Sequence, residues 1–339
     1  MKKYILSTGN ISPQQTFGQP FTQAEIITYT GNRMAAAEPD YSKLIDVKLI
    51  RRMSRIIKLG VAAAMECLQK ANINAPDAII TGTAYGCLQD TEVFLTRLVE
   101  NKEELLAPTA FIQSTHNTVG AQIALMLKCH AYNNTFVHRG FSFESALLDG
   151  CLLLEEQKAN TVLIGGIDEI TDTSHAILTR LGLYRRGAKG GEGAAFFLLA
   201  NQPSGSDYAR LDGMETLYKP KTVRDVEAAI QSFLAANGIG MHDVDLVITG
   251  QNGDAKGDAI YKQLSAVVWN NTPATGFKHL CGEYPTATAF ALWLAAEILK
   301  EGKAPPAVGQ VTVDKPVKRI LICNHFQNIH HSLFLLTAC

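Results

Sequence analysis

Four short and continuously apolar runs constrain the fold of this chain more than any other feature of its sequence. They are Ala78–Thr81, Thr161–Ile164, Val244–Thr249 and Arg319–Cys323. Few polar residues alternate with the apolar ones, a pattern typical of strands that are buried on both faces of a sheet. Such strands need helices on both sides, so the sequence predicts an α/β fold with mostly parallel sheets.

The segments between these runs have the periodicity of helices. In Leu49–Ala71, apolar side chains recur on one helical stripe. Phe143–Glu156 and Thr286–Lys300 are rich in Ala and Leu, which favour helices, and Val223–Ala236 is a further predicted helix. Strands and helices therefore alternate along the chain.

The two halves of the chain share a succession of elements. In each half, a helix runs through Ala-Asn into a short connector and then into a strand that ends in Thr-Gly, at Asp77–Gly82 and at Asp245–Gly250. In each half a later helix also leads into an apolar strand. This repeat indicates a duplication, and the Pro, Gly and Ser residues of Gln202–Ser206 suggest the boundary. We expect two halves, 1–203 and 204–339.

Composition excludes several classes of protein. The 339 residues carry a net charge of −1 and are 47% hydrophobic, which argues against a disordered chain and against a nucleic-acid-binding surface. The seven cysteines form no CxxC pair, so we expect reduced thiols, with neither a disulfide framework nor a metal site. The sequence shows no secretion signal and no stretch long enough to span a membrane. We therefore expect a cytoplasmic protein.

A series of motifs, in order along the whole chain, resembles the β-ketoacyl synthase family. The N-terminal half supplies Gly82–Gly86, Pro108–Phe111 followed by Ser114–Asn117, the helix Phe143–Glu156 with its next strand, and Gly191-Glu192-Gly193-Ala194, which is similar to the GEGA turn of the synthases. The C-terminal half supplies Gly257-Asp258, His279–Gly282, and Asn324-His325-Phe326, which stands where the synthases have an NSFGFGG loop.

The resemblance implies a duplicated thiolase-like fold with α-β-α-β-α layers and two mixed, mostly parallel sheets. The Ser114–Asn117 phrase and Arg51-Arg52-Met53-Ser54 look like those of short synthase-like proteins from pigment and aryl-polyene gene clusters, some of which are chain-length factors. Such relatives act in fatty-acid or polyketide synthesis of the aryl-polyene or flexirubin type. They imply an acyl carrier protein as partner, with its phosphopantetheine arm as a visiting group and no bound cofactor.

The catalytic residues of that family are only partly present. A condensing enzyme needs a cysteine thiolate at the start of the helix and two histidines that stabilise the enolate. Counting back from Gly165-Gly166 places the nucleophile at Gly140. Counting back from Asp258 places the first histidine at Gly250 or Gln251, and the family lysine falls near Ala274. The resemblance carries over only the second histidine, as His279.

The sequence therefore indicates a non-condensing, chain-length-factor-like partner of an active ketosynthase, in a heterodimer or with itself as a homodimer. It would shape a tunnel for the growing acyl chain. We expect the vestigial site and its surroundings to include Phe111, Ser114, His116, Asn117, His138, Gly140, Phe141, Ser142, His279 and Phe326.

An active acyl-transferring enzyme with an unusual nucleophile is the alternative. Cys281 lies two residues from His279, Cys87 follows a glycine loop, and Ser142 could use His138 as a base. Against these, a buried cysteine usually behaves as a small apolar side chain, and a serine at a helix start usually caps the helix. His325, His330 and His331 match no standard metal site.

Two pairs of arginines suggest a docking site for the acidic carrier protein. Arg51-Arg52 and Arg185-Arg186 could attract it by charge, and the simpler interpretation is that both pairs lie on solvated surfaces. Both interpretations stay open at this stage.

Overall fold

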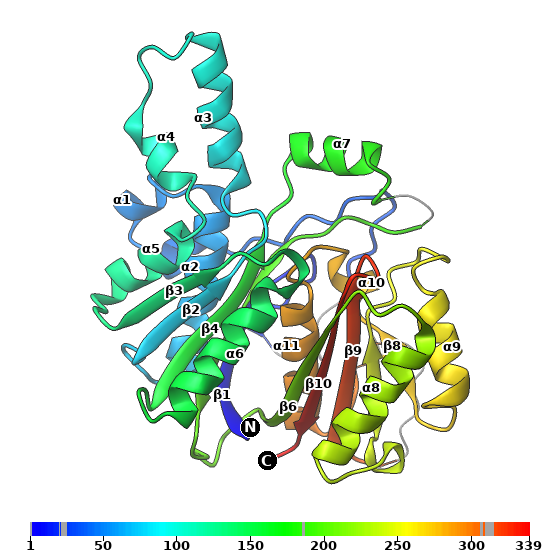
Figure 1. The fold of residues 1–339 in the computed structure, drawn as a ribbon. Helices are drawn as coiled ribbons and strands as arrows, with labels where there is room; N and C mark the ends of the chain where they lie inside the picture. Colours follow the sequence, from blue (N-terminus) through cyan, green and yellow to red (C-terminus); the bar gives the residue numbers. More distant parts are fainter. Residues whose placement is uncertain (1, 20, 22–25, 185–186, 306–307, 309–314) are drawn as a thin grey trace.

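The computed structural model describes residues 2–19, 21, 26–184, 187–305, 308 and 315–339, so the Arg185-Arg186 pair lies outside the described residues (Figure 1). Its strands join in one mixed sheet in the order β3-β2-β4-β5-β1-β6-β10-β9-β7-β8. The strands are β1 Lys3–Ile11, β2 Ala78–Gly82, β3 Tyr132–Phe136, β4 Thr161–Asp168, β5 Gly193–Ala200, β6 Ala209–Tyr218, β7 Leu246–Thr249, β8 Ala274–Gly276, β9 Arg319–Phe326 and β10 His330–Thr337.

The sheet repeats one arrangement twice, as the sequence echo predicted. From the outer edge inward, one half runs β3-β2-β4-β5-β1 and the other runs β8-β7-β9-β10-β6. In both halves the first two pairings are parallel and the next two are antiparallel. The described strands of the first half end at Ala200 and those of the second begin at Ala209. The precise boundary at 203/204 stays a prediction.

The sheet differs from the expectation in two details. The two halves are hydrogen-bonded into one sheet, although β1 and β6 pair over only three residues, from Lys3 opposite Leu211 to Ile5 opposite Ala209. Of the nine described strand pairings four are parallel and five antiparallel, so "mostly parallel" was wrong. Strand β5 shows the reason: all eight of its residues are buried, yet both its neighbours are antiparallel. Burial on both faces, and not strand direction, produces the continuous apolar pattern.

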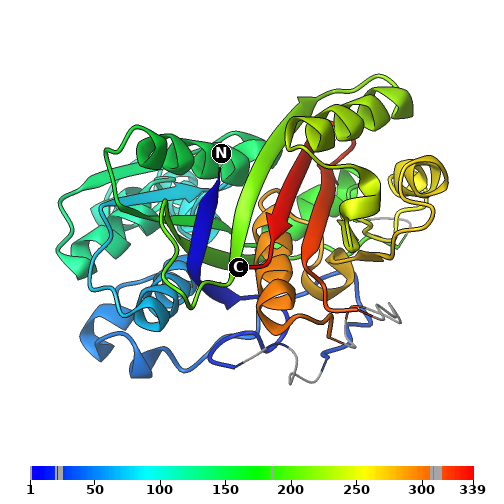
Figure 2. The same ribbon diagram turned by 90° about the horizontal axis from the view of Figure 1, so that it is seen from below.

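Helices cover the sheet in three layers. The described helices are η2 Tyr41–Lys43, α1 Val47–Ile50, α2 Arg55–Ala71, α3 Leu88–Glu100, α4 Pro108–Gln113, α5 Thr118–Leu127, η3 Arg139–Phe141, α6 Ser142–Glu155, α7 Asp172–Arg180, α8 Val223–Ala236, η4 Met241–Asp243, α9 Ala259–Val267, α10 Lys278–Cys281 and α11 Thr288–Glu301. Helices α2 and α5 pack on the outer face of the first half, and α8 and α9 pack on the outer face of the second. Helices α6 and α11 fill the centre (Figures 1 and 2).

Successive side chains along each strand point to opposite faces of the sheet, so they contribute to different parts of the hydrophobic core. Ile79 and Leu163 point to the α2 side, while Ile80 and Ile164 point to the central layer. The core clusters thus define the α-β-α-β-α layering that the resemblance implied. Helix α11 is almost entirely buried, which explains why its sequence is apolar on every side.

The predicted helix Leu49–Ala71 is divided in the structure. The chain turns after α1, and α2 begins at Arg55 with Ser54 as its N-cap residue. Serine prefers the extended backbone of an N-cap over a helix interior, and this preference places the break. No described helix combines the length and the apolar character that crossing a bilayer requires.

Candidate functional site

The turn between β3 and α6 is where the ketosynthase resemblance places the nucleophile. The chain passes from β3 through η3 into α6, and Arg139 adopts a left-handed backbone with φ of 53°. Gly140 is buried at this turn, and no cysteine lies in the first turn of α6. Cys151, the cysteine in α6, lies in the helix body and is buried against the apolar core.

The space that a nucleophile would need beside Gly140 is filled by other side chains. A Cβ atom added to Gly140 would lie 2.8 Å from Cβ of Phe326 and 3.0 Å from Cβ of His330. The Phe141 ring meets the His330 ring edge-on, with centroids 4.7 Å apart. The structure thus brings the predicted residues Gly140, Phe141 and Phe326 together, with His330 packed among them.

The position expected for the first catalytic histidine is filled in the same way. A Cβ on Gly250 would lie 2.0 Å from Oδ1 of Asn324 and 2.6 Å from the Tyr261 hydroxyl. The Tyr261 ring stacks on His325 at 4.9 Å, and its hydroxyl accepts a hydrogen bond from the His325 amide. Packing therefore closes Gly140 and Gly250, whereas Gln251, the other position predicted for the histidine, lines a surface pocket.

The Ser142 hydroxyl hydrogen-bonds to backbone groups of the preceding turn. Its buried hydroxyl accepts a hydrogen bond from the His138 amide at 2.9 Å and donates one to the Arg139 carbonyl at 2.8 Å. The His138 ring instead pairs with Ser145, with Nδ1 2.9 Å from Oγ. The predicted pair of the Ser142 hydroxyl and the His138 ring does not form. The ring bonds instead to Ser145, which lies about one helical turn further along α6.

His279 does not face the Gly140 turn from within the core. Its side chain is exposed and lines a surface pocket of about 390 Å³ with Lys189 and Gln251. Its neighbour Lys278 is the buried residue: Nζ contacts both carboxylate oxygens of Glu283, at 2.9 and 3.0 Å, and the His325 carbonyl at 2.8 Å. The role of His279 stays a prediction, and this position gives it little support.

Sequence reasoning missed Lys278. Its signal was a lysine set directly after Phe277 in an apolar segment, but nothing in the local pattern decides which of the two neighbours, Lys278 or His279, turns inward.

The candidate thiols are poor nucleophiles. Cys281 is fully buried, its Sγ lies 3.3 Å from the Gly282 carbonyl, and burial raises the pKa of its thiol well above the ordinary value. Burial likewise raises the pKa of Cys87, and the carboxylates of Asp90 and Glu169 raise it further. A thiol that stays protonated at neutral pH supplies little thiolate for attack on a thioester.

The remaining predicted residues lie on a separate surface. Phe111 and Ser114 belong to α4 and its C-cap, and His116 and Asn117 lie in the turn before α5. The Phe111 ring packs on Phe94 of α3 at 5.2 Å, yet its side chain is 56% exposed. Asn117 lines a groove of about 360 Å³ along α4 and α5. Figure 1 shows α3 and α4 extending away from the body of the protein.

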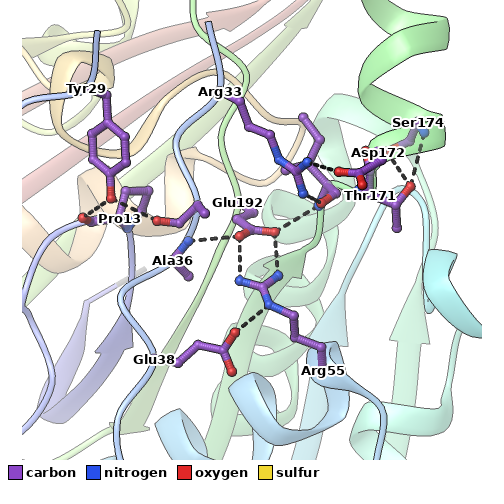
Figure 3. Close-up of polar contacts among 12 residues, drawn as sticks. Pro13, Tyr29, Arg33, Ala36, Glu38, Arg55, Thr171, Asp172, Ser174 and Glu192 are labelled. Carbon is purple, nitrogen blue, oxygen red and sulfur yellow. Dashed lines mark hydrogen bonds and ion pairs between the residues drawn. The ribbon is translucent and has the colours of Figure 1, made fainter. Parts of the chain in front are cut away.

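The GEGA-like turn is held by a buried carboxylate (Figure 3). Glu192 receives two hydrogen bonds from the Arg55 guanidinium, at 2.6 and 2.7 Å, and one each from the amides of Ala36 and Ile170. A Cβ on Gly191 would lie 1.9 Å from the Cys281 carbonyl oxygen, so the turn needs glycine there. The motif thus ties α2 to the short helix α10, which carries His279 and Cys281.

A buried carboxyl group in the first turn of α6 was also missed. Glu144 is 1% exposed, and burial raises its pKa to about 7, although the Thr288 and Ser332 hydroxyls partly oppose this shift. The helical pattern alone places Glu144 beside apolar residues without indicating that it is buried. Among the described residues, no three His, Cys, Asp or Glu side chains are grouped as a metal ion would require.

A pocket of mixed polar and apolar character opens beside the filled site. It has a volume of about 280 Å³ and is lined by residues from four segments, among them Leu183, Asn252, Gly257, His325 and Asn328. Both ring nitrogens of His325 already have partners, the Gly257 carbonyl and the Asn328 amide. Side-chain amides and backbone groups of this kind can hydrogen-bond a flexible polar chain that carries amides of its own.

Comparison with known proteins agrees with this geometry. Residues 30–183 match the family model described as the β-ketoacyl synthase N-terminal domain. A search of curated proteins finds no match to the sequence. The solved structures that resemble the whole chain in fold include the following three.

One of them is the ishigamide ketosynthase/chain length factor, with a TM-score of 0.82 and 16% identity over 100% of this chain and 99% of that chain. Another is a type II polyketide synthase acyl-carrier protein in complex with its ketosynthase, AntDE:AntF, with a TM-score of 0.78 and 15% identity over 100% and 99%. The third is the ketosynthase ApeO in complex with its chain length factor ApeC from Xenorhabdus doucetiae, with a TM-score of 0.77 and 17% identity over 99% and 98%.

These matches establish the fold of the protein. It has the thiolase-like fold of the ketosynthases from end to end, and its N-terminal part matches their sequence model. The resemblance predicted from its motifs is confirmed. The assignment of Gly140 to the position of the nucleophile stays a prediction.

Proposed function

We propose that this chain is the non-condensing, chain-length-factor-like partner of an active β-ketoacyl synthase, and that it helps to shape the tunnel for the growing acyl chain. The packing of Phe326 and His330 against Gly140 carries this proposal. A condensing enzyme must form a thioester on its own cysteine, and here neither the sulfur nor the room for it is present. The scaffold remains available for binding a partner.

The partner surface is best supported at the free edge of the sheet. Strand β3 ends the sheet, so one side of its backbone has no neighbour among the described strands, and such an edge readily pairs with another chain. Helix α6 packs on β3, and its Leu148 and Leu152 are 46% and 48% exposed. Exposed apolar residues continue around this edge at Tyr132, Val137, Leu125, Phe111 and Ile112.

An exposed apolar surface that surrounds a free strand edge indicates a protein interface. A second ketosynthase-fold subunit is the partner we favour, since it offers an equivalent edge. Two of the structural neighbours combine a ketosynthase with a chain length factor. An active ketosynthase is therefore the first partner to test, and a second copy of this chain is the alternative.

A basic pocket is the proposed docking site for the acyl carrier protein. It has a volume of about 440 Å³ and lies at the foot of α3 and α4, with Arg51, Arg52 and Lys58 in its lining. None of these three cations forms an ion pair with a described carboxylate. Unpaired positive charge of this kind attracts an acidic partner.

The visiting phosphopantetheine arm would enter the pocket beside His325 and Asn328. We expect the assembly to work in the cytoplasm, in fatty-acid or polyketide synthesis of the aryl-polyene or flexirubin type.

Co-expression with the ketosynthases of the same genome tests the partnership. The proposal expects a stable complex of this chain with one ketosynthase at a 1:1 ratio, and a condensing activity that depends on the ketosynthase cysteine. If no ketosynthase co-purifies and this chain alone condenses acyl groups, the proposal is wrong.

Intact mass measurement tests the loss of covalent chemistry. Purified protein incubated with acyl-carrier thioester should show no acyl adduct, while the partner ketosynthase in the same tube should gain one acyl group. A stable adduct on this chain that disappears in Ser142→Ala, Cys281→Ala or Cys87→Ala would establish the active-enzyme alternative.

A further inference from the structure

The N-terminus of helix α2 opens into the basic pocket at the foot of α3 and α4. The lining of this pocket of about 440 Å³ includes Met53, Ser54, Arg55 and Lys58, the residues around which α2 begins. Helix α2 has 17 residues, and the Ser54 side chain makes no hydrogen bond that caps it. The first amides of a helix have no partner within the helix. Such a terminus carries partial positive charge and favours a bound anion.

Three cationic side chains surround this helix terminus. Arg51 and Arg52 are exposed, Lys58 is half-buried, and none of them pairs with a carboxylate in the described part of the chain. Arg55 differs, because its guanidinium is bound to Glu38 and to the buried carboxylate of the GEGA-like turn (Figure 3). That pairing also neutralises Glu38, one of the two carboxylates in the pocket lining. Three positive charges thus remain for an anionic ligand.

The second carboxylate of the lining, Asp90, has an oxygen without a partner. Asp90 is 9% exposed, and its Oδ2 atom is buried with no hydrogen-bond partner among the described residues. The Ser54 hydroxyl, also in the lining, is buried and unpartnered in the same way. Burial raises the pKa of Asp90 and the nearby Ser54 hydroxyl partly opposes this shift, yet the two side chains form no hydrogen bond with one another. Buried polar atoms normally have partners, so these two indicate a ligand with hydrogen-bonding groups of its own.

We propose that the basic pocket binds a small phosphate ester of a polyol. The phosphate lies at the start of α2, where it accepts hydrogen bonds from the helix amides and from Arg51 and Arg52. A hydroxyl of the ligand donates to Asp90, and the Ser54 hydroxyl can either donate or accept. The inference goes beyond the proposed function, because the site belongs to this chain alone and needs neither the ketosynthase nor the carrier protein.

Asp90 is the reason why an ester fits better than a bare anion. A phosphate placed directly against this carboxylate would meet a like charge and would leave Oδ2 without a donor. A hydroxyl between the two supplies the donor and keeps the charges apart. The pocket is also the proposed docking site of the carrier protein, so a bound ester would compete with the carrier for the same cations.

Isothermal titration calorimetry on the purified full-length chain tests the site. The probes are glycerol 3-phosphate, inorganic phosphate and glycerol, all at one ionic strength because salt screens exposed charges. Glycerol 3-phosphate should bind about fivefold more tightly than inorganic phosphate, the gain that one further hydrogen bond gives. Glycerol lacks the anion and should not bind.

Two double variants locate the site. Arg51→Ala/Arg52→Ala removes two exposed cations of the pocket and should weaken the binding of glycerol 3-phosphate about tenfold. Lys221→Ala/Arg224→Ala is the matched control. It removes two exposed cations beside the start of α8, where a capping box closes the helix terminus, and it should bind like the unmodified chain.

Asp90→Ala tests the contact with the hydroxyl. This variant should lose the preference for glycerol 3-phosphate over inorganic phosphate and should still bind phosphate, because the helix amides and the arginines remain. If Asp90→Ala does not fold, Ser54→Ala removes the neighbouring unpartnered hydroxyl and is measured in the same way, with a reduced preference expected.

Three results would overturn the inference. They are the absence of saturable binding of glycerol 3-phosphate, equal affinities for the ester and for inorganic phosphate, and equal losses in the two double variants. In each case the proposed function stands, because neither the ketosynthase nor the carrier protein takes part in the measurement. Conversely, if the chain forms no complex with a ketosynthase, the proposed function is wrong and the titration still decides this site.

Discussion

Gly140 and His330 pack so closely that a side chain on the glycine would lie 3.0 Å from both Cβ and Cγ of the histidine. In a condensing enzyme this is the place of the nucleophile, according to the motif resemblance. His330 belongs to β10, which pairs with β9 around the turn that replaces the glycine-rich loop of the synthases. The β9–β10 turn and the side-chain-free position at Gly140 are thus parts of one packing arrangement.

Restoring the cysteine alone should not restore the site. In Gly140→Cys the added sulfur must displace Phe326 or His330, so we expect a loss of about 1–3 kcal/mol in the free energy of unfolding, as in other overpacked cores. The new thiol should react slowly with iodoacetamide, whereas Gly31→Cys, at a position with open space, should react fast. Equal reaction rates of the two thiols would show that the site is open.

The Arg55–Glu192 pair should be among the most costly contacts to remove. Glu192 is fully buried and accepts four hydrogen bonds, so Glu192→Gln leaves the Arg55 charge without its main partner. We expect a loss of about 3–5 kcal/mol in chemical denaturation. Glu38→Gln is the control, because Glu38 contacts the same arginine from a more exposed position, and it should cost less than about 1 kcal/mol. Similar costs for the two variants would contradict this assignment.

Glu144 should make the stability of the protein fall as pH rises. Its pKa is raised to about 7 in the folded state, from an ordinary value of 4.5. Between these two values the folded protein binds more protons than the unfolded chain, so the free energy of unfolding decreases with increasing pH across that window. The total effect is about 3 kcal/mol.

Glu144→Gln removes this titration. Urea denaturation at pH 5 and pH 8 should show the variant gaining stability relative to the unmodified protein at the higher pH. Glu169 also has a pKa raised to about 7 by burial and provides the comparison, because it titrates in both proteins. If the two proteins keep the same difference in stability at both values of pH, Glu144 is not the group that titrates.

Leu148→Asp/Leu152→Asp should weaken the complex with the ketosynthase. Both leucines are already about half exposed, so the change should leave the fold of the isolated chain intact. Burying two carboxylates in an interface should reduce affinity by at least tenfold. Val267→Asp, at an equally exposed apolar position on α9, is the control and should bind normally. If the double variant binds with unchanged affinity, the interface does not lie at β3 and α6.

Charge reversal at Arg51 and Arg52 should weaken binding of the carrier protein. Arg51→Glu/Arg52→Glu places negative charge in the basic pocket, and we expect an affinity several-fold lower at low salt, with a smaller difference at high salt. Arg224→Glu, on the exposed face of α8, should bind like the parent. Carrier binding that is insensitive to the first variant would exclude this pocket as the docking site.

The sequence alone determined the fold to a large extent. Residues 78–81, 161–164 and 319–323 all lie in strands, and the run 244–249 begins two residues before β7. The predicted helix Val223–Ala236 has those same limits in the structure. Ordered motifs also indicated the family and the missing nucleophile. These features are local, because burial on both faces and helical periodicity are recorded in neighbouring residues.

Only the tertiary structure decided which side chains meet. The local pattern could not choose between Lys278 and His279, place Ser145 in preference to Ser142 against His138, or bring Phe326 and His330 onto Gly140. It also could not reveal that three residue pairs between β1 and β6 join the two halves of the sheet. Each of these contacts joins segments through the packing of whole layers, and side-chain direction at such contacts depends on where distant elements come to rest.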